Sequence, residues 1–197
     1  MKIAQRAMLG LAVALLALGA TVGATGTAGA DGPKTDPAVI RAINQQPWVE
    51  LGPGDTDYRV ASVACYLVRY GHHDECDPSG TGEAWPENFA QSVRKYQESK
   101  YLPKSGRLDI ETWANLQRDN GEIGLGAQGD HVKAVQYAMK VLQDSSLVVD
   151  GIYGPATEAA VTAFQKRKEI DADGIFGPIT FRAAFAQGAE EKRTPGR

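Results

Sequence analysis

Apolar residues recur at helical spacing in two separate parts of the chain. Both series advance by three, four and three positions: Val60, Val63, Leu67 and Tyr70, then Val132, Val135, Met139 and Leu142. This spacing places the side chains on one face of an α-helix. The second series begins 72 positions after the first, which predicts that the same helix and its surroundings occur twice.

Further along, the two halves match at an offset of 68 positions. The matching residues are Val93, Tyr96, Gln97, Gly106, Thr112 and Trp113 in the first half, and Val161, Phe164, Gln165, Gly174, Thr180 and Phe181 in the second. The change of offset puts four extra residues of the first half into the loop 71–83. We predict an all-α protein of two tandem small three-helix bundles, 51–117 and 125–186, joined by a polar linker at 118–124.

One short phrase occurs twice in the second half. Residues 150–157 read Asp-Gly-Ile-Tyr-Gly-Pro-Ala-Thr, and residues 173–180 read Asp-Gly-Ile-Phe-Gly-Pro-Ile-Thr. Asp-Gly is typical of a tight turn, and proline is well tolerated in the first turn of a helix. Each phrase therefore predicts a turn followed by a helix. In the first half, residues 82–87 lack the Asp, both glycines and the threonine, whereas residues 105–112 keep one glycine and the threonine.

The phrases supply the candidate ligand-binding residues. These are Asp150, Gly151, Tyr153, Gly154, Asp173, Gly174, Phe176 and Gly177. The two aromatic rings could stack on a sugar or peptide or close a small core; a core position is favoured for Phe176, and both interpretations stay open for Tyr153. The two aspartates are expected to accept backbone N–H bonds within their own turns and so to shape the surface on which a ligand rests.

Residues 1–30 are typical of a secretion signal. Lys2 and Arg6 precede the apolar run Ala7–Ala20, and the segment ends in Ala-Gly-Ala. The run is shorter than the roughly 20 residues that span a bilayer, so we expect cleavage before Asp31, with an uncleaved anchor as the alternative.

The segments that flank the two bundles have weaker patterns. Residues 31–50 are predicted to form an extension with one short helix that begins at Asp36-Pro37, and Trp48 is expected to pin this extension onto the first bundle. The tail 187–197 has no apolar periodicity, so we expect it to be disordered.

The two cysteines, Cys65 and Cys76, both lie in the first half. In an exported protein this pair predicts one disulfide that closes a short loop and contributes roughly 2–3 kcal/mol. The formal net charge of −3, without a basic stripe, argues against nucleic acid or anionic lipid as a ligand.

The sequence offers little catalytic chemistry. Residues 72–76 read His-His-Asp-Glu-Cys, but five consecutive side chains cannot converge on one ion, so we expect a solvated loop and neither metal nor cofactor. Serine-hydrolase and zinc-protease motifs are absent. A carboxylate pair among Glu158, Asp171 and Asp173 stays open, although a small helical unit offers little cleft for a sugar ring. We expect no enzymatic activity.

Four motifs of the second half resemble the three-helix peptidoglycan-binding module of bacterial cell-wall hydrolases. They are Gly-Asp-x-Val-x-x-Val-Gln at 129–136, Ala-Val-x-x-Phe-Gln at 160–165, and the two phrases. Residues 51–116 are similar to a degenerate second copy. The resemblance implies non-covalent binding to bacterial peptidoglycan. With the secretion signal, we expect a secreted protein that is extracellular or associated with the cell wall, and we expect a monomer. The alternative is a protein-interaction subunit that targets or inhibits a separate extracellular wall hydrolase.

Overall fold

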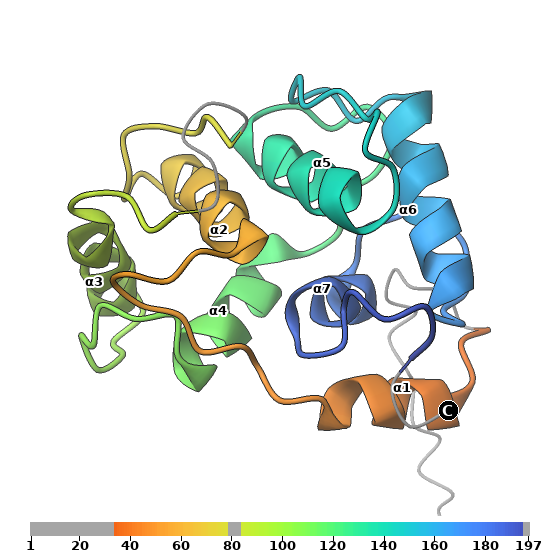
Figure 1. Ribbon diagram of the computed structural model, residues 1–197, viewed down its shortest axis with the longest axis horizontal. Helices are drawn as coiled ribbons and strands as arrows, with labels where there is room; N and C mark the ends of the chain where they lie inside the picture. The colour runs from red at the N-terminus through yellow and green to blue at the C-terminus, as the bar shows by residue number, and fades with distance from the viewer. Residues whose placement is uncertain (1–33, 79–83, 195–197) are drawn as a thin grey trace, which may run out of the picture.

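The computed structural model describes residues 34–78 and 84–194, and this part of the chain is all-helical, as predicted (Figure 1). Its helices are α1 (Pro37–Gln45), α2 (Tyr58–Arg69), α3 (Phe89–Ser99), α4 (Ile110–Asn120), α5 (Asp130–Leu142), α6 (Pro155–Arg167) and α7 (Pro178–Phe185). The same residues contain no β-strand, only isolated bridges between loops. None of these helices is long and apolar enough to cross a bilayer. The predicted secretion signal at 1–30 lies outside the described residues.

Helices α2–α4 and α5–α7 form two units with the same internal pairing. Each unit begins with an extended strip, 51–56 or 123–128, that bridges to the two turns of its own unit. The bridges are Leu51 with Leu108 and Thr56 with Ala84 in the first unit, and Ile123 with Phe176 and Gln128 with Ile152 in the second. Corresponding residues of the two strips are 72 positions apart, and their partners in the turns are 68 positions apart, as in the sequence comparison. In the first unit the strip therefore joins the turns before α3 and α4, and in the second unit it joins the turns before α6 and α7.

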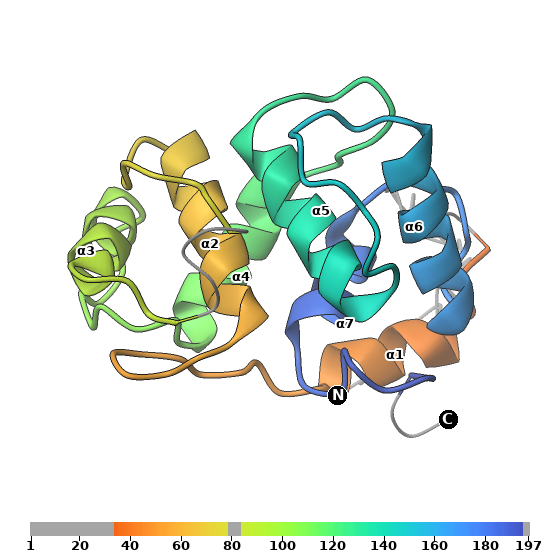
Figure 2. The same ribbon diagram turned by 45° about the horizontal axis from the view of Figure 1, so that its top comes forward.

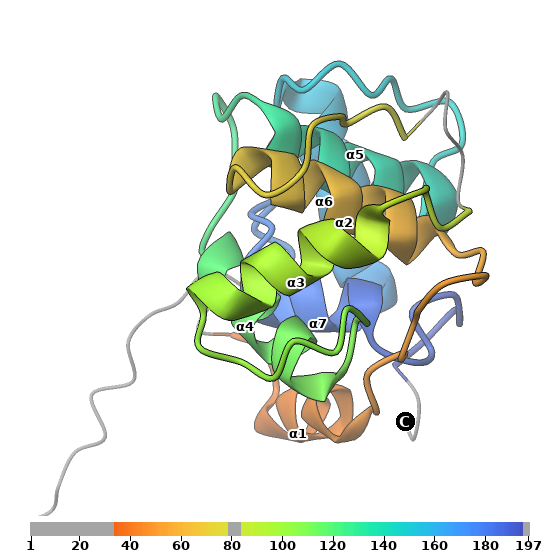
Figure 3. The same cartoon turned by 90° about the vertical axis from the view of Figure 1, so that its left-hand side faces the viewer.

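The two units share one hydrophobic core. Helix α2 packs against α5 in the most extensive helix pairing of the described chain, and α4 packs against α7. Helices α3 and α6 occupy opposite outer sides (Figure 2). Figure 3 shows α3 on the outer side of the first unit, in front of α2 and α4. The first helices of the two units, α2 and α5, thus pack on each other, and so do the third helices, α4 and α7. Two subunits related by two-fold symmetry make contacts of this kind.

Aromatic rings fill the boundary between the units. The Trp113 and Phe185 ring centroids lie 5.7 Å apart, and those of Tyr66 and Phe181 lie 5.8 Å apart. A unit of this size has only a marginal core of its own, so joining the two cores stabilises both units. The two bundles are therefore fused rather than independent.

The prediction that residues 118–124 form a linker between separate bundles is wrong, because the two units share one core. Residues 118–120 belong to α4; Ile123 is 2% exposed, and its backbone bridges to that of Phe176. The Asn120 side chain also donates to the Phe176 carbonyl at 3.2 Å. The segment is part of the interface between the units.

The extension before residue 51 joins both units. Asp36 caps α1 as expected, because its carboxylate accepts from the Ala38 N–H at 2.7 Å, and α1 packs on α7. Trp48 stacks on Trp113 of the first unit with centroids 5.5 Å apart, and it also meets the edge of Phe181 of the second unit at 6.3 Å. The prediction that Trp48 pins the extension to the first unit alone was incomplete.

The tail is packed as far as residue 194, which corrects the expectation of disorder. The Lys168 ammonium donates to the carbonyls of Gly188 at 2.6 Å and Glu191 at 2.9 Å, and Thr194 Oγ1 donates to the Lys168 carbonyl at 2.6 Å. Arg59, 2% exposed, forms an ion pair with Glu190 at 2.9 Å. Bonds from buried cations, rather than an apolar stripe, hold these residues in place.

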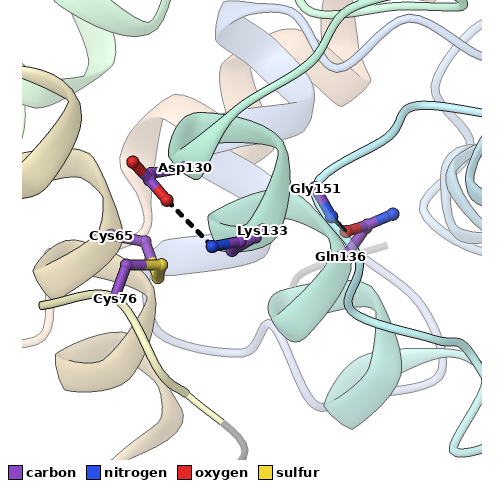
Figure 4. Close-up of a disulfide and its surroundings, with 6 residues drawn as sticks. All are labelled: Cys65, Cys76, Asp130, Lys133, Gln136 and Gly151. Carbon is purple, nitrogen blue, oxygen red and sulfur yellow. Dashed lines mark hydrogen bonds and ion pairs between the residues drawn. A yellow bond between two sulfur atoms is a disulfide. The ribbon is translucent and has the colours of Figure 1, made fainter.

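The disulfide between Cys65 and Cys76 is present, with the two Cα atoms 4.6 Å apart (Figure 4). Cys65 lies on the buried face of α2, and Cys76 lies in the loop that follows this helix. The bond therefore attaches the loop directly to the helix that packs on α5.

Because the units share a core, reducing this disulfide should destabilise both units together. We expect a melting temperature lower by about 4–12 °C in one calorimetric transition, given the ~2–3 kcal/mol of a loop of this size. Differential scanning calorimetry of oxidised and reduced protein measures this, with a Cys65→Ala/Cys76→Ala variant as a reagent-free control. Two separate transitions, or no shift, would contradict the shared core or the role of the disulfide.

Candidate functional site

Buried glutamine side chains hold the two phrases in shape. Gln165 Nε2 on α6 donates to Asp173 Oδ1 at 2.8 Å, to the Ile175 carbonyl at 2.9 Å and to Thr180 Oγ1 at 3.1 Å. Its Oε1 accepts from the Gly174 N–H at 2.9 Å. One buried amide thus forms hydrogen bonds with the backbone of the phrase, with its aspartate and with the threonine in the first turn of α7.

Gln136 on α5 does the same for the first phrase. Its Nε2 donates to Asp150 Oδ1 at 2.8 Å, to the Ile152 carbonyl at 3.0 Å and to Thr157 Oγ1 at 3.1 Å. Its Oε1 accepts from the Gly151 N–H at 2.8 Å (Figure 4). The repeated Asp, Gly and Thr of the phrases are therefore the partners of one amide in each turn.

A third glutamine holds one turn of the first unit. Gln97 Nε2 donates to Ser105 Oγ at 2.9 Å, to the Arg107 carbonyl at 3.0 Å and to Thr112 Oγ1 at 2.8 Å. Its Oε1 accepts from the Gly106 N–H at 2.9 Å. Sequence reasoning missed this role, although the match of Gln97 with Gln165 was its signal.

The fourth turn has no such glutamine. Position 64, which corresponds to Gln136, is Ala64, and the neighbouring residue is Cys65. The loop that leads to this turn is attached to α2 by the disulfide between Cys65 and Cys76. In the first unit, a covalent bond thus lies on α2 next to the position at which α5 carries Gln136.

The turn glycines have the backbone that the sequence predicts. Gly151 has φ of 78° and Gly174 has φ of 73°, in the left-handed region. A Cβ atom on Gly174 would also lie 2.8 Å from Glu158 Cγ. The candidate glycines Gly154 and Gly177 have extended backbones and cap the N-termini of α6 and α7.

The two phrase aspartates bond within their own turns, as expected. Asp150 Oδ1 accepts from the Ile152 N–H at 2.8 Å, and Asp173 Oδ1 accepts from the Ile175 N–H at 2.9 Å. The hydrogen bonds from Gln136 and from the Ile152 N–H lower the pKa of Asp150. Both carboxylates are exposed and are fixed in direction by these contacts.

The two candidate aromatic rings lie in the core. Tyr153 is 1% exposed and Phe176 is 0% exposed. The Tyr153 hydroxyl donates to the Gly174 carbonyl at 2.8 Å, so it connects the first phrase to the second. Burial raises the pKa of this hydroxyl. Neither ring offers a free face on which a sugar could stack.

A hollow of ≈ 470 Å³ lies beside the second phrase; we call it the acidic hollow. Its walls come from the end of the α4–α5 connection, the first turn of α6 and the second phrase: Glu122, Gly124, Leu125, Ala127, Glu158, Asp173, Gly174 and Ile175. Of the candidate residues, only Asp173 and Gly174 line it. Of the three carboxylates considered as a pair, Glu158 and Asp173 line it and Asp171 does not.

The acidic hollow combines negative charge with small and apolar surfaces. Three carboxylates and no basic or aromatic side chain occur among its described walls. Leu125 is 62% exposed at its rim. The carboxylates of such a surface can accept hydrogen bonds from a ligand and form ion pairs with a cation. Its apolar side chains can contact an aliphatic chain.

A second hollow, of ≈ 420 Å³, lies between the disulfide loop and α3. There His73 Nδ1 lies 2.9 Å from Ser92 Oγ, a contact that the sequence did not predict. The Gln91 and Ser92 N–H groups donate to the Asn88 carbonyl, so neither is available to an oxyanion. No three His, Cys, Asp or Glu side chains of the described residues converge as a metal site.

The second unit is a small helical bundle with a shallow hollow on its surface. Residues 128–184 match the family described as putative peptidoglycan binding domain. The matched segment contains both phrases, Gln136, Gln165 and the Glu158–Ile175 side of the acidic hollow.

Three curated relatives are bacterial enzymes. The chain is 27% identical over 147 residues to the N-acetylmuramoyl-L-alanine amidase CwlM of Mycobacterium tuberculosis, with 67% of this chain and 36% of that protein covered. It is 42% identical over 115 residues to the amidase CwlL of Bacillus licheniformis (55% and 32% covered). It is 37% identical over 83 residues to the zinc D-Ala-D-Ala carboxypeptidase of Streptomyces albus G (41% and 30% covered). The chain thus spans about a third of these relatives. No solved structure matches it significantly.

Replacing Gln165 by leucine should destabilise the protein by at least about 2 kcal/mol, because it orphans a buried N–H, a carbonyl and a hydroxyl. Urea unfolding followed by tryptophan fluorescence measures the loss. Gln91→Leu, at an exposed position on α3, is the matched control and should change the free energy of unfolding little. Equal effects of the two substitutions would refute the structural role of Gln165.

Because the pKa of Asp150 is lowered in the folded protein, the free energy of unfolding should fall as the pH is lowered. A carboxylate whose pKa is lower in the folded state stabilises the protein above its unfolded-state pKa of about 4, and the term is lost as the pH falls through the folded-state value. Thermal melts at pH values from about 2 to about 6 should fall less steeply for Asp150→Asn than for wild type. Parallel curves would contradict the assignment.

Proposed function

We propose that the protein binds bacterial cell-wall peptidoglycan through the acidic hollow of its second unit and does not cleave it. The observation that carries the proposal is the match of residues 128–184 to the peptidoglycan-binding family, since this segment supplies Glu158, Asp173, Gly174 and Ile175 of the hollow. The candidate residues of the first phrase act indirectly: Tyr153 bonds to Gly174 of the second phrase, and Gln136 on α5 holds the first phrase in place.

The proposal of binding without catalysis is supported by the local chemistry. In the described part of the chain, the N–H groups next to the His73–Ser92 contact are already bonded to Asn88. The matched segment is similar to a module described as peptidoglycan-binding, which supports a role in binding.

We further propose that the protein acts outside the cell as a monomer. A disulfide is typical of proteins that leave the reducing cytoplasm, and residues 1–30 have the pattern of a secretion signal. Wall-associated binding and export are consistent with each other.

The first unit is proposed to be a divergent copy of the same module. Its strip, its bridges and its Gln97 contacts repeat those of the second unit. The alignment with the mycobacterial amidase is longer than the segment 128–184, so it extends beyond the second unit. Gly106 and Thr112 are the parts of the phrase that this copy retains.

Co-sedimentation with purified insoluble peptidoglycan tests the binding. The protein should sediment with peptidoglycan and not with cellulose, and Ala127→Trp, which fills the acidic hollow, should weaken binding about tenfold by steric exclusion of the ligand. Tyr101→Ala is the control, because this side chain is 98% exposed on the first unit. No sedimentation of the wild type would refute the proposed function.

The same suspensions test for cleavage. Soluble wall fragments should stay at the level of a protein-free sample. Release of fragments that increases with protein concentration would contradict the proposal that the chain only binds.

A further inference from the structure

A cleft of ≈ 450 Å³ lies where the extension before residue 51 meets both units; we call it the junction cleft. Its walls include Gln45, Trp48 and Glu50 of the extension, Ile110 at the start of α4, Arg182 on α7 and Gln187 just after α7. The Gln187 N–H donates to the Pro47 carbonyl at 2.9 Å, which joins two of these walls. Because the extension and both units contribute, a single three-helix unit cannot form this cleft.

Arg182 is held in one orientation in the wall of the junction cleft. Its Nε donates to the Ile43 carbonyl at 3.2 Å, and its Nη2 donates to the carbonyls of Asn44 at 3.0 Å and Gln46 at 2.7 Å. Its Cζ lies 4.2 Å from the centroid of the Trp48 ring, in a cation–π contact. These bonds satisfy carbonyls at the end of α1, which gives Nε and Nη2 a structural role.

The same contacts use only part of the Arg182 guanidinium. Its Nη1 forms no hydrogen bond with the described residues, and none of the ion pairs among these residues involves it. Burial lowers the pKa of this guanidinium. Carbonyls at a helix end offset part of the cost of burying a cation, but a carboxylate does so more strongly. The corresponding residue of the first unit is Ala114, so the fold of a unit does not require this arginine.

A carboxylate on the wall of the junction cleft does not neutralise Arg182. Glu50 is exposed there and forms no ion pair or hydrogen bond with the residues that the structure describes. The side-chain amides of Gln45 and Gln187 are exposed as well and have no hydrogen-bond partner in this part of the chain. Two opposite charges thus line one cleft without forming a pair. Such a surface is complementary to a ligand that carries both a carboxylate and an ammonium group.

We infer that the junction cleft binds the stem peptide of peptidoglycan, with Arg182 donating to a stem carboxylate and Glu50 pairing with the ammonium group of a diamino acid. The inference rests on the proposed function and adds a second contact with the same polymer. Stem peptides carry both charges on a short chain, and their amide groups match the two exposed glutamine side chains. Ile110, 59% exposed at the rim, contacts the methyl groups of stem alanines.

Other parts of the cell wall fit the junction cleft less well. A sugar ring would need an exposed aromatic face, but Trp48 is 7% exposed and is stacked on Trp113 with centroids 5.5 Å apart. A wall phosphate could pair with Arg182, but the Glu50 carboxylate would repel it. The stem peptide is thus the part of the wall that matches both charges.

Calorimetric titration with a soluble stem peptide tests the inference. The probe is N-acetyl-L-alanyl-γ-D-glutamyl-L-lysine, in which the carboxylates and the lysine ammonium group are free. We expect the affinity to fall about tenfold when the carboxylates are converted to amides, and about fivefold when the lysine side chain is acetylated. Equal affinities for the free and the amidated peptide would overturn the inference.

Sedimentation with the intact polymer tests the proposed function separately. Failure of the wild type to sediment with peptidoglycan would refute that function itself. Sedimentation of the wild type, together with equal affinities for the free and the amidated peptide, would leave the function standing and overturn the assignment of the junction cleft.

A substitution beside Arg182 tests its role without breaking its bonds to α1. Gln187→Glu places a carboxylate on the wall of the cleft, where it should compete for Arg182 and weaken binding of the free peptide about tenfold. The matched control is Gln91→Glu, which makes the same change of charge at an exposed position on α3 and should have no effect. A Gln187→Glu protein with both the melting temperature and the peptide affinity of the wild type would contradict the role of Arg182.

Glu50→Gln tests the second charge of the cleft. This substitution should weaken binding of the free peptide about fivefold, because it removes the partner of the ammonium group. Binding of the peptide with an acetylated lysine should stay as it is for the wild type. Equal losses for both peptides would show that Glu50 acts on the structure of the cleft and would overturn its assignment as the ammonium partner.

Discussion

The structure depends on a constraint that a buried amide imposes on a turn. A glutamine in the core has two N–H donors and an oxygen acceptor that must all be bonded, and the turns around Gly106, Gly151 and Gly174 supply those partners. This explains why Asp or Ser, Gly and Thr occur together at fixed spacing. The side-chain N–H groups of the glutamine donate to a side-chain oxygen in the turn and to a hydroxyl in the next helix. Its oxygen accepts from the backbone N–H of a glycine that has a left-handed conformation. The acidic hollow is the outer surface of one such turn, so its shape is fixed from within.

The second determinant is the contact between the units. Helices α2 and α5 and the rings of Trp48, Trp113 and Phe181 make one core from two repeats. The first unit therefore stabilises the second whether or not it binds a ligand of its own. Its own turn surface has diverged in charge, with Arg94 and Arg107 against the glycines. Divergence at the surface and retention in the core are consistent with a copy that has kept its structural role.

The helices and the two phrase turns could be predicted from sequence because they depend on local spacing. The fusion of the units could not, since an apolar stripe on α2 or α4 looks the same whether it faces its own unit or another. The packed tail was missed because backbone carbonyls hold it through Lys168, and carbonyls leave no sequence pattern. Tyr153 was ambiguous because a tyrosine has an apolar ring and a polar end, and only the structure shows its hydroxyl bonded to Gly174. The hollow itself, formed by the α4–α5 connection, α6 and the second phrase, has no contiguous signature in the chain.

Three turns of the protein are bonded to a buried glutamine, whereas the loop before the fourth turn is held by a disulfide, so the turns have different requirements for assembly. Hydrogen bonds to Gln97, Gln136 and Gln165 form wherever the chain folds, but the bond between Cys65 and Cys76 needs an oxidising compartment. In a reducing environment, the three turns bonded to glutamines can close while the loop after α2 stays unattached. The attachment of this loop therefore depends on the redox state of the surroundings, whereas the turn that forms the acidic hollow depends on hydrogen bonds.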